Sequence, residues 1–167
     1  MNSDGYKGVE IPDFIRKGSE YEIGSYTFTA EKIIEFATAF DPQHFHMDHE
    51  AAGKSMFGGL CASGWHTTSV WMKLQRKATA THVTRLKKEG KAWPDFGPSP
   101  GMENLKWLKP VYANDTITYT NKIMGIRRSD SKPDWWIMSN FSRGENQHGD
   151  RVMQFDSSVF LKIHPAP

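Results

Sequence analysis

The sequence lacks, or has little of, several features that would assign it to a particular class of protein. Cys61 is the only cysteine in 167 residues, so the chain cannot form an internal disulfide. It has no run of about 18 apolar residues, which excludes a hydrophobic transmembrane helix. The charges nearly cancel, and a formal net charge of +2 is too small to indicate nucleic acid as a partner. These absences predict a soluble globular protein and leave small-molecule chemistry as the open route.

Two further expectations follow from what is missing. Residues 1–5 lack the basic and then apolar profile of a secretory signal, so we expect a cytoplasmic location. Cys61 lies next to small residues, and we expect a buried structural thiol rather than a nucleophile.

The chain length fits one domain with a sizeable core and is short for two. We therefore expect a single domain over residues 1–167. Within it, residues 1–19 form an irregular N-terminal arm that packs on the body or on another subunit.

The first third of the chain predicts a strand and then a helix. Residues 21–27 are rich in β-forming side chains, and Thr29 can cap a helix that runs to about Phe40. Pro42 ends this helix, because proline disfavours helical geometry in the residue before it. The i, i+3, i+4, i+7 spacing predicts a buried face made of Ile33, Phe36, Ala37 and Phe40.

The rest of the chain separates one long helix from a group of strands. We expect the helix from Trp65 to about Lys88, a long loop over residues 90–101, and antiparallel hairpins from Asn104 onward. The side chains expected to face a sheet are Trp65, Trp71, Met72 and Leu74. The basic residues Lys73, Arg76, Lys77, Arg85, Lys87 and Lys88 indicate a solvated face or, less simply, a phosphate-binding one. This order predicts an α+β fold in which the long helix covers the sheet.

An acid and an imidazole lie close together where the first helix ends. Asp41 would sit at the C-terminal edge of that helix and His46 on the loop beyond, so that both could point into one cavity. The alternative is that each only stabilises the turn through backbone hydrogen bonds.

The surrounding residues carry a resemblance to a known family. Residues 41–48 read Asp-Pro-Gln-His-Phe-His-Met-Asp, and Ala51-Ala52, Phe57-Gly58-Gly59 and Ser63-Gly64 follow. This order is similar to the MaoC-like dehydratases, which include the R-specific enoyl-CoA hydratases and share the pattern D-x-N-P-x-H-x-D, then A and F-G, then H-G. Residues 108–116 resemble that family's entry into a long strand. Together the match covers most of residues 20–163.

The resemblance implies a hotdog fold, an antiparallel sheet wrapped around one long central helix, usually assembled into homodimers. It implies that Asp41 and His46 form the hydratase dyad and that the Gly64 amide contacts the thioester oxygen. Adding water across the double bond of an enoyl thioester requires a base, an acid and donors for the enolate oxygen. An acid, an imidazole and an amide at a helix N-terminus could supply them.

Three positions depart from the family pattern. Gln43 stands where the family has asparagine, His44 replaces its proline, and Ser63 replaces its histidine. Gln43 and Ser63 remain candidates for substrate binding. We expect His44 to be a surface residue, with a third polar group at the site as the alternative.

We therefore expect a hydro-lyase acting on a 2-enoyl or 3-hydroxyacyl thioester, with CoA or acyl carrier protein as part of the substrate. We expect no redox cofactor, no bound metal, no membrane partner, and a homodimer or higher homo-oligomer. Three alternatives stay open: an acyl-CoA thioesterase, a non-catalytic acyl-thioester-binding protein, and a metal site. The candidate metal ligands are His44, His46, Asp48, His49 and His66.

Overall fold

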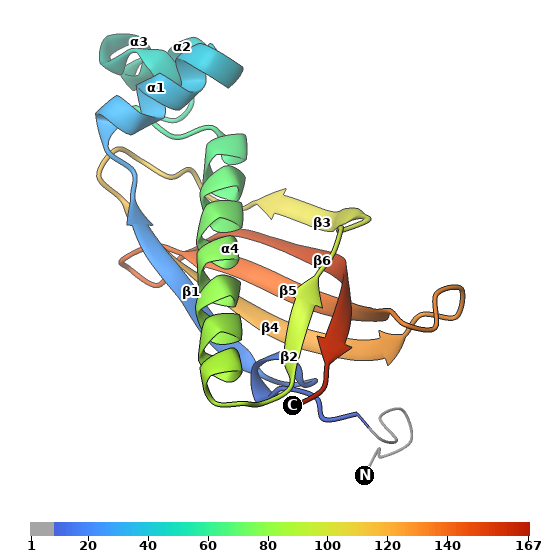
Figure 1. Ribbon diagram of the computed structural model, residues 1–167. Coiled ribbons are helices and arrows are strands. Elements are labelled where there is room, and N and C mark those ends of the chain that lie inside the picture. The colour runs from blue at the N-terminus through green and yellow to red at the C-terminus, as the bar shows by residue number, and fades with distance from the viewer. Residues whose placement is uncertain (1–8) are drawn as a thin grey trace.

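A computed structural model describes residues 9–167, in which an antiparallel sheet curls around one long helix (Figure 1). The helical elements are the 3-10 turn Asp13–Ile15, α1 Ala30–Phe40, α2 His44–Met47, α3 His49–Gly53 and α4 Gly64–Lys88. The strands are β1 Glu20–Thr27, β2 Trp93–Phe96, β3 Gly101–Trp107, β4 Thr116–Arg128, β5 Trp136–Glu145 and β6 Arg151–His164. The sheet order is β1-β4-β5-β6-β2, and β3 also pairs with β6. This is the predicted α+β hotdog fold.

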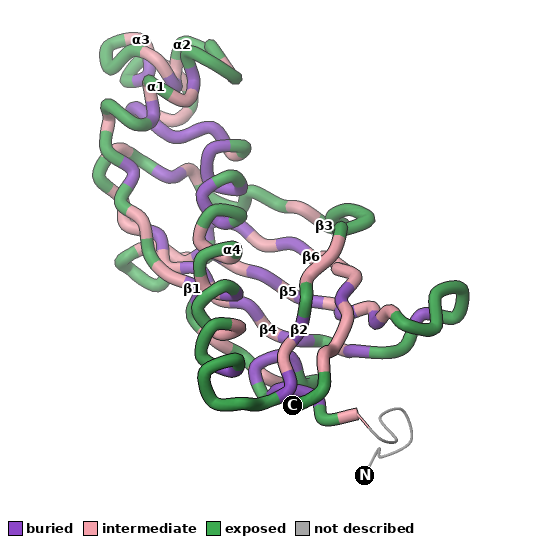
Figure 2. The backbone as a smooth tube through the Cα atoms, viewed as in Figure 1, coloured by how far each residue is buried: buried purple, intermediate pink, exposed green. Residues whose placement is uncertain are grey.

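Helix α4 runs across the concave face of the sheet (Figure 1), and buried and exposed residues alternate along it (Figure 2). Trp71 is 5% exposed and meets the Phe155 ring edge-on, with 4.6 Å between ring centroids. Trp65 and Met72 are 57% and 43% exposed, so the prediction that they face the sheet is wrong. At 100° per residue Trp65 and Met72 lie on one side of the helix, about 100° to 120° around its axis from Trp71.

Strand β1 bends around α4 at a glycine. Its register with β4 shifts between Glu22 and Gly24, and Gly24 has φ +133°, a conformation that favours glycine. A side chain at this position would also meet Leu74 of α4. The sheet can therefore follow the helix closely on this side.

Helix α1 has the predicted bounds, and Thr29 caps it by accepting a hydrogen bond from the Lys32 amide at 3.3 Å. Ile33 and Ala37 are buried as predicted, whereas Phe40 is 75% exposed. Placing Phe40 on the buried face was wrong. The cluster of α1, α2 and α3 stands beyond the end of the sheet (Figure 1), and the Phe40 ring lies against Phe36 of the same helix, with 5.0 Å between ring centroids.

The prediction of a continuous loop over residues 90–101 is wrong for residues 93–96. Strand β2 lies within this range and pairs with residues 161–164 of β6. Pro94 is accommodated because β2 lies at the edge of the sheet, where a proline need not donate to a neighbouring strand.

Residues near the N-terminus pack on the body of this chain. Ile11, Phe14 and Ile15 are buried against Leu86 and Trp136 in one of two apolar clusters. The first part of the predicted arm, residues 1–8, lies outside the described residues, and the single domain stays a prediction. Within residues 9–167, no helix has the length and apolar character needed to cross a membrane.

Candidate active site

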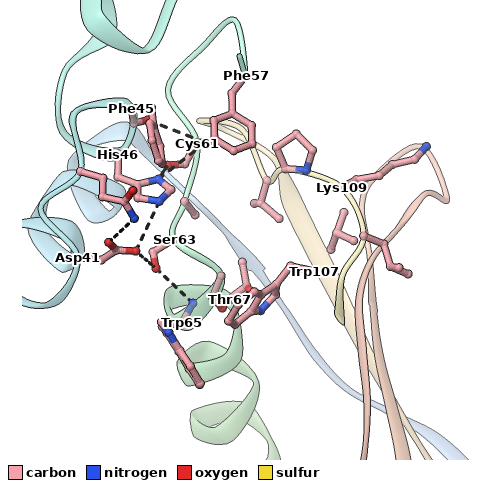
Figure 3. A pocket seen from close by; sticks show the side chains of 17 residues that line it. Asp41, Phe45, His46, Phe57, Cys61, Ser63, Trp65, Thr67, Trp107 and Lys109 are labelled. Atoms are coloured by element: carbon pink, nitrogen blue, oxygen red, sulfur yellow. Dashed lines mark hydrogen bonds and ion pairs between the residues drawn. The ribbon is translucent and has the colours of Figure 1, made fainter. Parts of the chain in front are cut away.

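Asp41 ends helix α1 and points toward the start of α4 (Figure 3). Its amide still bonds Ala37 of the last helical turn at 2.9 Å, while its φ of −152° takes the chain out of the helix. Pro42 follows and prevents the helix from continuing. The carboxyl group is thereby fixed at a turn, with its side chain 20% exposed.

His46 lies on the short helix α2 rather than on a loop, which corrects the predicted position. The residue is 6% exposed, and its Nδ1 is 2.7 Å from the carbonyl oxygen of Cys61. A carbonyl oxygen only accepts hydrogen bonds, so Nδ1 carries a proton. In the neutral imidazole, Nε2 is then left with a free lone pair.

The Asp41 carboxylate and the His46 imidazole face each other across a short gap. His46 Nε2 is 3.6 Å from Asp41 Oδ2, which is too long for a direct hydrogen bond. Both atoms accept hydrogen bonds when His46 is neutral. A water molecule could donate one hydrogen to each, so the pair has the geometry needed to hold and polarise one water.

Gln43 and Ser63 both donate hydrogen bonds to Asp41. Gln43 Nε2 is 2.8 Å from Oδ1, and Ser63 Oγ is 2.7 Å from Oδ2. Burial raises the pKa of Asp41, but these two bonds and the nearby His46 outweigh it and leave the pKa below its ordinary value. Both side chains therefore hold the Asp41 carboxylate in its charged form, and substrate binding by them stays a prediction.

Ser63 also joins the carboxylate to helix α4. It is 1% exposed, and its Oγ accepts a hydrogen bond from the Trp65 amide at 3.3 Å, as an N-cap does. The same hydroxyl thus caps the helix and positions Asp41 (Figure 3).

Gly64 is the first residue of α4, and no acceptor among the described residues bonds its amide. The Trp107 indole covers the other side of this residue, because a β-carbon on Gly64 would overlap that ring. Trp107 is held by its Nε1, which donates to Thr68 Oγ1 at 3.2 Å. The position therefore requires glycine, and its free amide lies at the positive end of the helix dipole.

These groups border one cavity of about 480 Å³. Figure 3 shows Asp41 and His46 on one side of the cavity and, across from them, the segment 107–111 with Trp107 and Lys109. This segment is held against the dyad side because the Ala62 amide donates to the Val111 carbonyl oxygen at 2.7 Å.

Cys61 lines the cavity but has the properties of a structural thiol. It is 1% exposed, and burial raises its pKa to about 11. The thiol therefore stays protonated near neutral pH, in agreement with the expectation that Cys61 is not a nucleophile.

The other histidines of the motif region do not join the dyad. His44 is exposed and does not line the cavity, as expected for a surface residue. His66 is buried, stacked on Phe36 with 4.6 Å between ring centroids, and burial lowers its pKa to about 4. Within residues 9–167, no three His, Cys, Asp or Glu side chains lie close enough together to hold a metal ion.

Two groups at the site were not identified from the sequence. Trp107 is packed on Gly64 from 43 residues away, and Lys109 lies on the cavity wall in an ion pair with Asp150 at 2.6 Å. The only signal for Lys109 was the resemblance of residues 108–116 to a family segment, and Trp107 was taken as a structural aromatic residue. The basic residues of α4 are exposed, and none of them lines this cavity.

Comparisons with known proteins agree with the fold and with the family that the sequence resembles. The family described as "MaoC like domain" matches residues 16–135. The chain is 26% identical over 145 residues to the uncharacterized protein YdeM of Bacillus subtilis, covering 87% of this chain and 94% of that protein. It is also similar to the crystal structure of a MaoC-like dehydratase from Rhodospirillum rubrum, with a TM-score of 0.76, 31% identity, and coverage of 93% and 99% of the two chains. The (R)-hydratase from A. caviae, at 19% identity and a TM-score of 0.62, covers 89% of this chain and 98% of its own length and shares the fold.

Proposed function

Since the chain belongs to the MaoC-like domain family, we propose that it is a hydro-lyase that adds water to a 2-enoyl thioester or removes water from a 3-hydroxyacyl thioester. The observation that carries the proposal is the pair of facing acceptors, Asp41 Oδ2 and His46 Nε2, 3.6 Å apart at the entrance to α4. An (R)-hydratase and a MaoC-like dehydratase among the structural relatives support the reaction class.

In the hydration direction, the two acceptors would hold one water against the β-carbon of the substrate. His46 Nε2 takes a proton from this water as its oxygen bonds to the β-carbon. The resulting imidazolium lies beside the Asp41 carboxylate, which stabilises it and accepts a hydrogen bond from the new hydroxyl group, where the second water hydrogen stays. His46 then returns its proton to the α-carbon, so that one water is added in total.

The negative charge that develops on the thioester oxygen would be met by the Gly64 amide. This N–H has no other acceptor among residues 9–167 and lies at the N-terminus of a helix of 25 residues. A preorganised donor of this kind stabilises the enolate more than the starting thioester.

The thioester would be that of CoA, which enters as part of the substrate and not as a separate cofactor. The cavity of about 480 Å³ is too small for a whole CoA molecule, so the nucleotide would remain outside it. Acyl carrier protein presents the same phosphopantetheine arm, and a parallel assay with acylated carrier protein distinguishes the two. The reaction needs no redox cofactor, and a cytoplasmic enzyme fits this substrate.

We expect the enzyme to be a homodimer or a higher homo-oligomer. Strand β3 is exposed along most of its length, and beyond its pairing with β6 it has no other strand partner within residues 9–167. A second copy can extend the sheet there. Light scattering of the purified protein gives the oligomeric state. A monomer at micromolar concentration would contradict the expected homo-oligomer.

The test is to add purified protein to crotonyl-CoA and to longer trans-2-enoyl-CoAs while recording both the enoyl absorbance and the release of free thiol. Loss of absorbance without thiol release supports the hydro-lyase. Thiol release from saturated acyl-CoA would instead identify a thioesterase. Binding of acyl-CoA with neither change would identify a non-catalytic binding protein.

A further inference from the structure

The amide proposed to donate to the thioester oxygen lies on a residue with unusual backbone freedom. Gly64 has to be glycine because the Trp107 ring covers it, and glycine can adopt more conformations than any other residue. The first turn of a helix also lacks the amide hydrogen bonds that hold later turns. A donor stabilises a transition state best when it is already fixed in place. Other groups must therefore hold the Gly64 amide.

Hydrogen bonds hold both peptide units that flank Gly64. The Gly64 N–H belongs to the same planar unit as the Ser63 carbonyl, whose oxygen accepts from the amides of His66 at 2.9 Å and Thr67 at 3.2 Å. The Gly64 carbonyl, in the next unit, accepts from Thr67 Oγ1 at 2.7 Å and Thr68 Oγ1 at 2.9 Å. The direction of the Gly64 N–H depends on these bonds.

The two threonines differ from the other threonines of α4. A threonine hydroxyl often bonds to a carbonyl oxygen one turn back in a helix, as Thr79 and Thr81 do further along α4, at 2.9 and 3.0 Å. In the first turn, however, two hydroxyl groups bond the same carbonyl oxygen. Each of these two threonines is also bonded to a side chain of the sheet.

Thr68 connects Gly64 to strand β3. Its Oγ1 accepts a hydrogen bond from Trp107 Nε1 at 3.2 Å, while its own hydrogen goes to the Gly64 carbonyl oxygen. Both directions are fixed, because an indole N–H only donates and a carbonyl oxygen only accepts. Thr68 is buried. One hydroxyl group therefore joins the indole to the glycine that it covers.

Thr67 is connected in the same way to strand β4. The Tyr119 hydroxyl group is buried and donates to the Thr67 carbonyl oxygen at 2.9 Å. Burial raises the pKa of this hydroxyl group, so it keeps its proton. Strands β3 and β4 are not neighbours in the sheet. The start of α4 is thus tied to the sheet at two separate places.

We propose that Thr68 and Tyr119 are positioning residues, which hold the Gly64 amide where the enolate oxygen forms. Neither residue lines the cavity at the dyad, so each acts through Gly64 and not by contact with the substrate. This inference rests on the proposed function, because it assigns the Gly64 amide to the thioester oxygen. Loss of either hydroxyl group should lower kcat more than it weakens substrate binding.

The first test compares kcat with KM. Thr68→Val and Tyr119→Phe each remove one hydroxyl group and keep nearly the same shape. We expect kcat for hydration of crotonyl-CoA to fall about 10-fold in each, with KM, and Kd for saturated butyryl-CoA, within about threefold of wild type. Thr68→Ser keeps the hydroxyl group and should keep kcat within about threefold. Unchanged kcat in both variants, or a rise in KM alone, would overturn the proposal.

The matched control is Thr79→Val. Thr79 is a buried threonine of the same helix that makes the same kind of bond, to the Gln75 carbonyl oxygen. Its loss should lower the melting temperature about as much as Thr68→Val does and leave kcat unchanged. If kcat falls equally in both variants, the rate follows the general stability of α4 and the assignment is wrong.

A second test reads the donor without turnover. The probe is acetoacetyl-CoA, whose enolate carries negative charge on the thioester oxygen and absorbs at wavelengths where the keto form does not. We expect Thr68→Val and Tyr119→Phe to raise the pKa of the bound acetoacetyl-CoA by about one unit, a tenfold change, and Thr79→Val to leave it in place. The same pKa in all four proteins, wild type included, would overturn the proposal.

The failure of the proposed function looks different. If crotonyl-CoA is not hydrated but the pKa of bound acetoacetyl-CoA still rises in Thr68→Val and Tyr119→Phe, the positioning role holds and the hydro-lyase does not. If crotonyl-CoA is hydrated and these variants behave like Thr79→Val, the hydro-lyase holds and the positioning role fails.

Discussion

Two regions along α4 treat polar groups in opposite ways. At the N-terminus of the helix, both carboxylate oxygens of Asp41 accept hydrogen bonds and His46 Nδ1 is bonded to a carbonyl oxygen. Near the middle of the helix, Trp71 Nε1 and Gln75 Oε1 have no partner within residues 9–167. The protein therefore fixes the polar groups of the dyad and leaves the two groups on α4 unpaired, at a cost in stability.

The largest effect is expected for the dyad. Asp41→Asn keeps the size of the side chain but removes the charge that stabilises the His46 imidazolium. We expect hydration of crotonyl-CoA to fall by about 10² to 10⁴ fold. Asp134→Asn changes an exposed aspartate at a turn and is the matched control. Activity of Asp41→Asn within a few fold of wild type would remove Asp41 from the mechanism.

Gly64→Ala should have the next largest effect. The added methyl group would overlap the Trp107 ring, so the start of α4 or the indole must shift, and stability should fall by about 1 to 3 kcal/mol. We expect activity to fall about 100-fold, because the amide donor moves with the helix end. Stability is read from thermal unfolding and activity from the enoyl absorbance.

Two further variants test whether the overlap with Trp107 is the reason that Gly64→Ala loses stability. Gly53→Ala is the control, because a β-carbon at this helical glycine meets no atom within 4 Å. The double variant Gly64→Ala/Trp107→Ala should regain stability relative to Gly64→Ala alone. If it does not, the overlap with Trp107 is not the reason for glycine at this position.

Ser63→Ala should produce a smaller change with a distinctive pH signature. The hydrogen bond from Ser63 helps to hold the pKa of Asp41 below its ordinary value, so its loss raises that pKa. The acidic limb of the activity profile should then move to higher pH. We expect activity at neutral pH to fall about 10-fold.

The stability of the folded protein depends on pH through the same Asp41 carboxyl group. The lowered pKa of Asp41 stabilises the folded state above the ordinary aspartate range, and this contribution is lost as the pH falls through the lowered value. Ser63→Ala weakens it and removes a helix cap worth about 1 kcal/mol. Thr29→Ala removes the cap of α1 without touching Asp41 and should lower stability while leaving the pH profile in place.

The smallest effect is expected at Gln75, near the middle of α4, and has the opposite sign. Gln75→Leu removes a buried acceptor that has no partner, so stability should rise by up to about 1 kcal/mol. Gln43→Leu, which removes a bond to Asp41, should lower activity instead. A fall in melting temperature for Gln75→Leu would show that its oxygen is already satisfied in the free protein.

Much of the fold could be predicted from local patterns. The cap at Thr29, the stop at Pro42 and the long breaker-free run of α4 each depend on a few adjacent residues, and each was placed correctly. Strand β2 was missed because Pro94 and the glycines around it read as a loop. Its pairing with β6, about 65 residues away, decides its structure.

The site was only partly predictable for the same reason. The spacing of Asp41 and His46 indicated that they could meet, because a single turn separates them. The overlap of Trp107 with Gly64, and the burial of Gln75 Oε1, depend on how the strands lie against α4. No local pattern in one sequence records such a contact.

The central claim is that Asp41 and His46 add the atoms of one water across the double bond of an acyl thioester. The most direct measurement is mass spectrometry of the products formed from crotonyl-CoA in ¹⁸O-labelled water. The account predicts one ¹⁸O in the hydroxyl group of intact 3-hydroxybutyryl-CoA, in an amount that falls with the rate in Asp41→Asn. Label in a free carboxylic acid, with release of unlabelled CoA, would contradict the account and identify hydrolysis of the thioester.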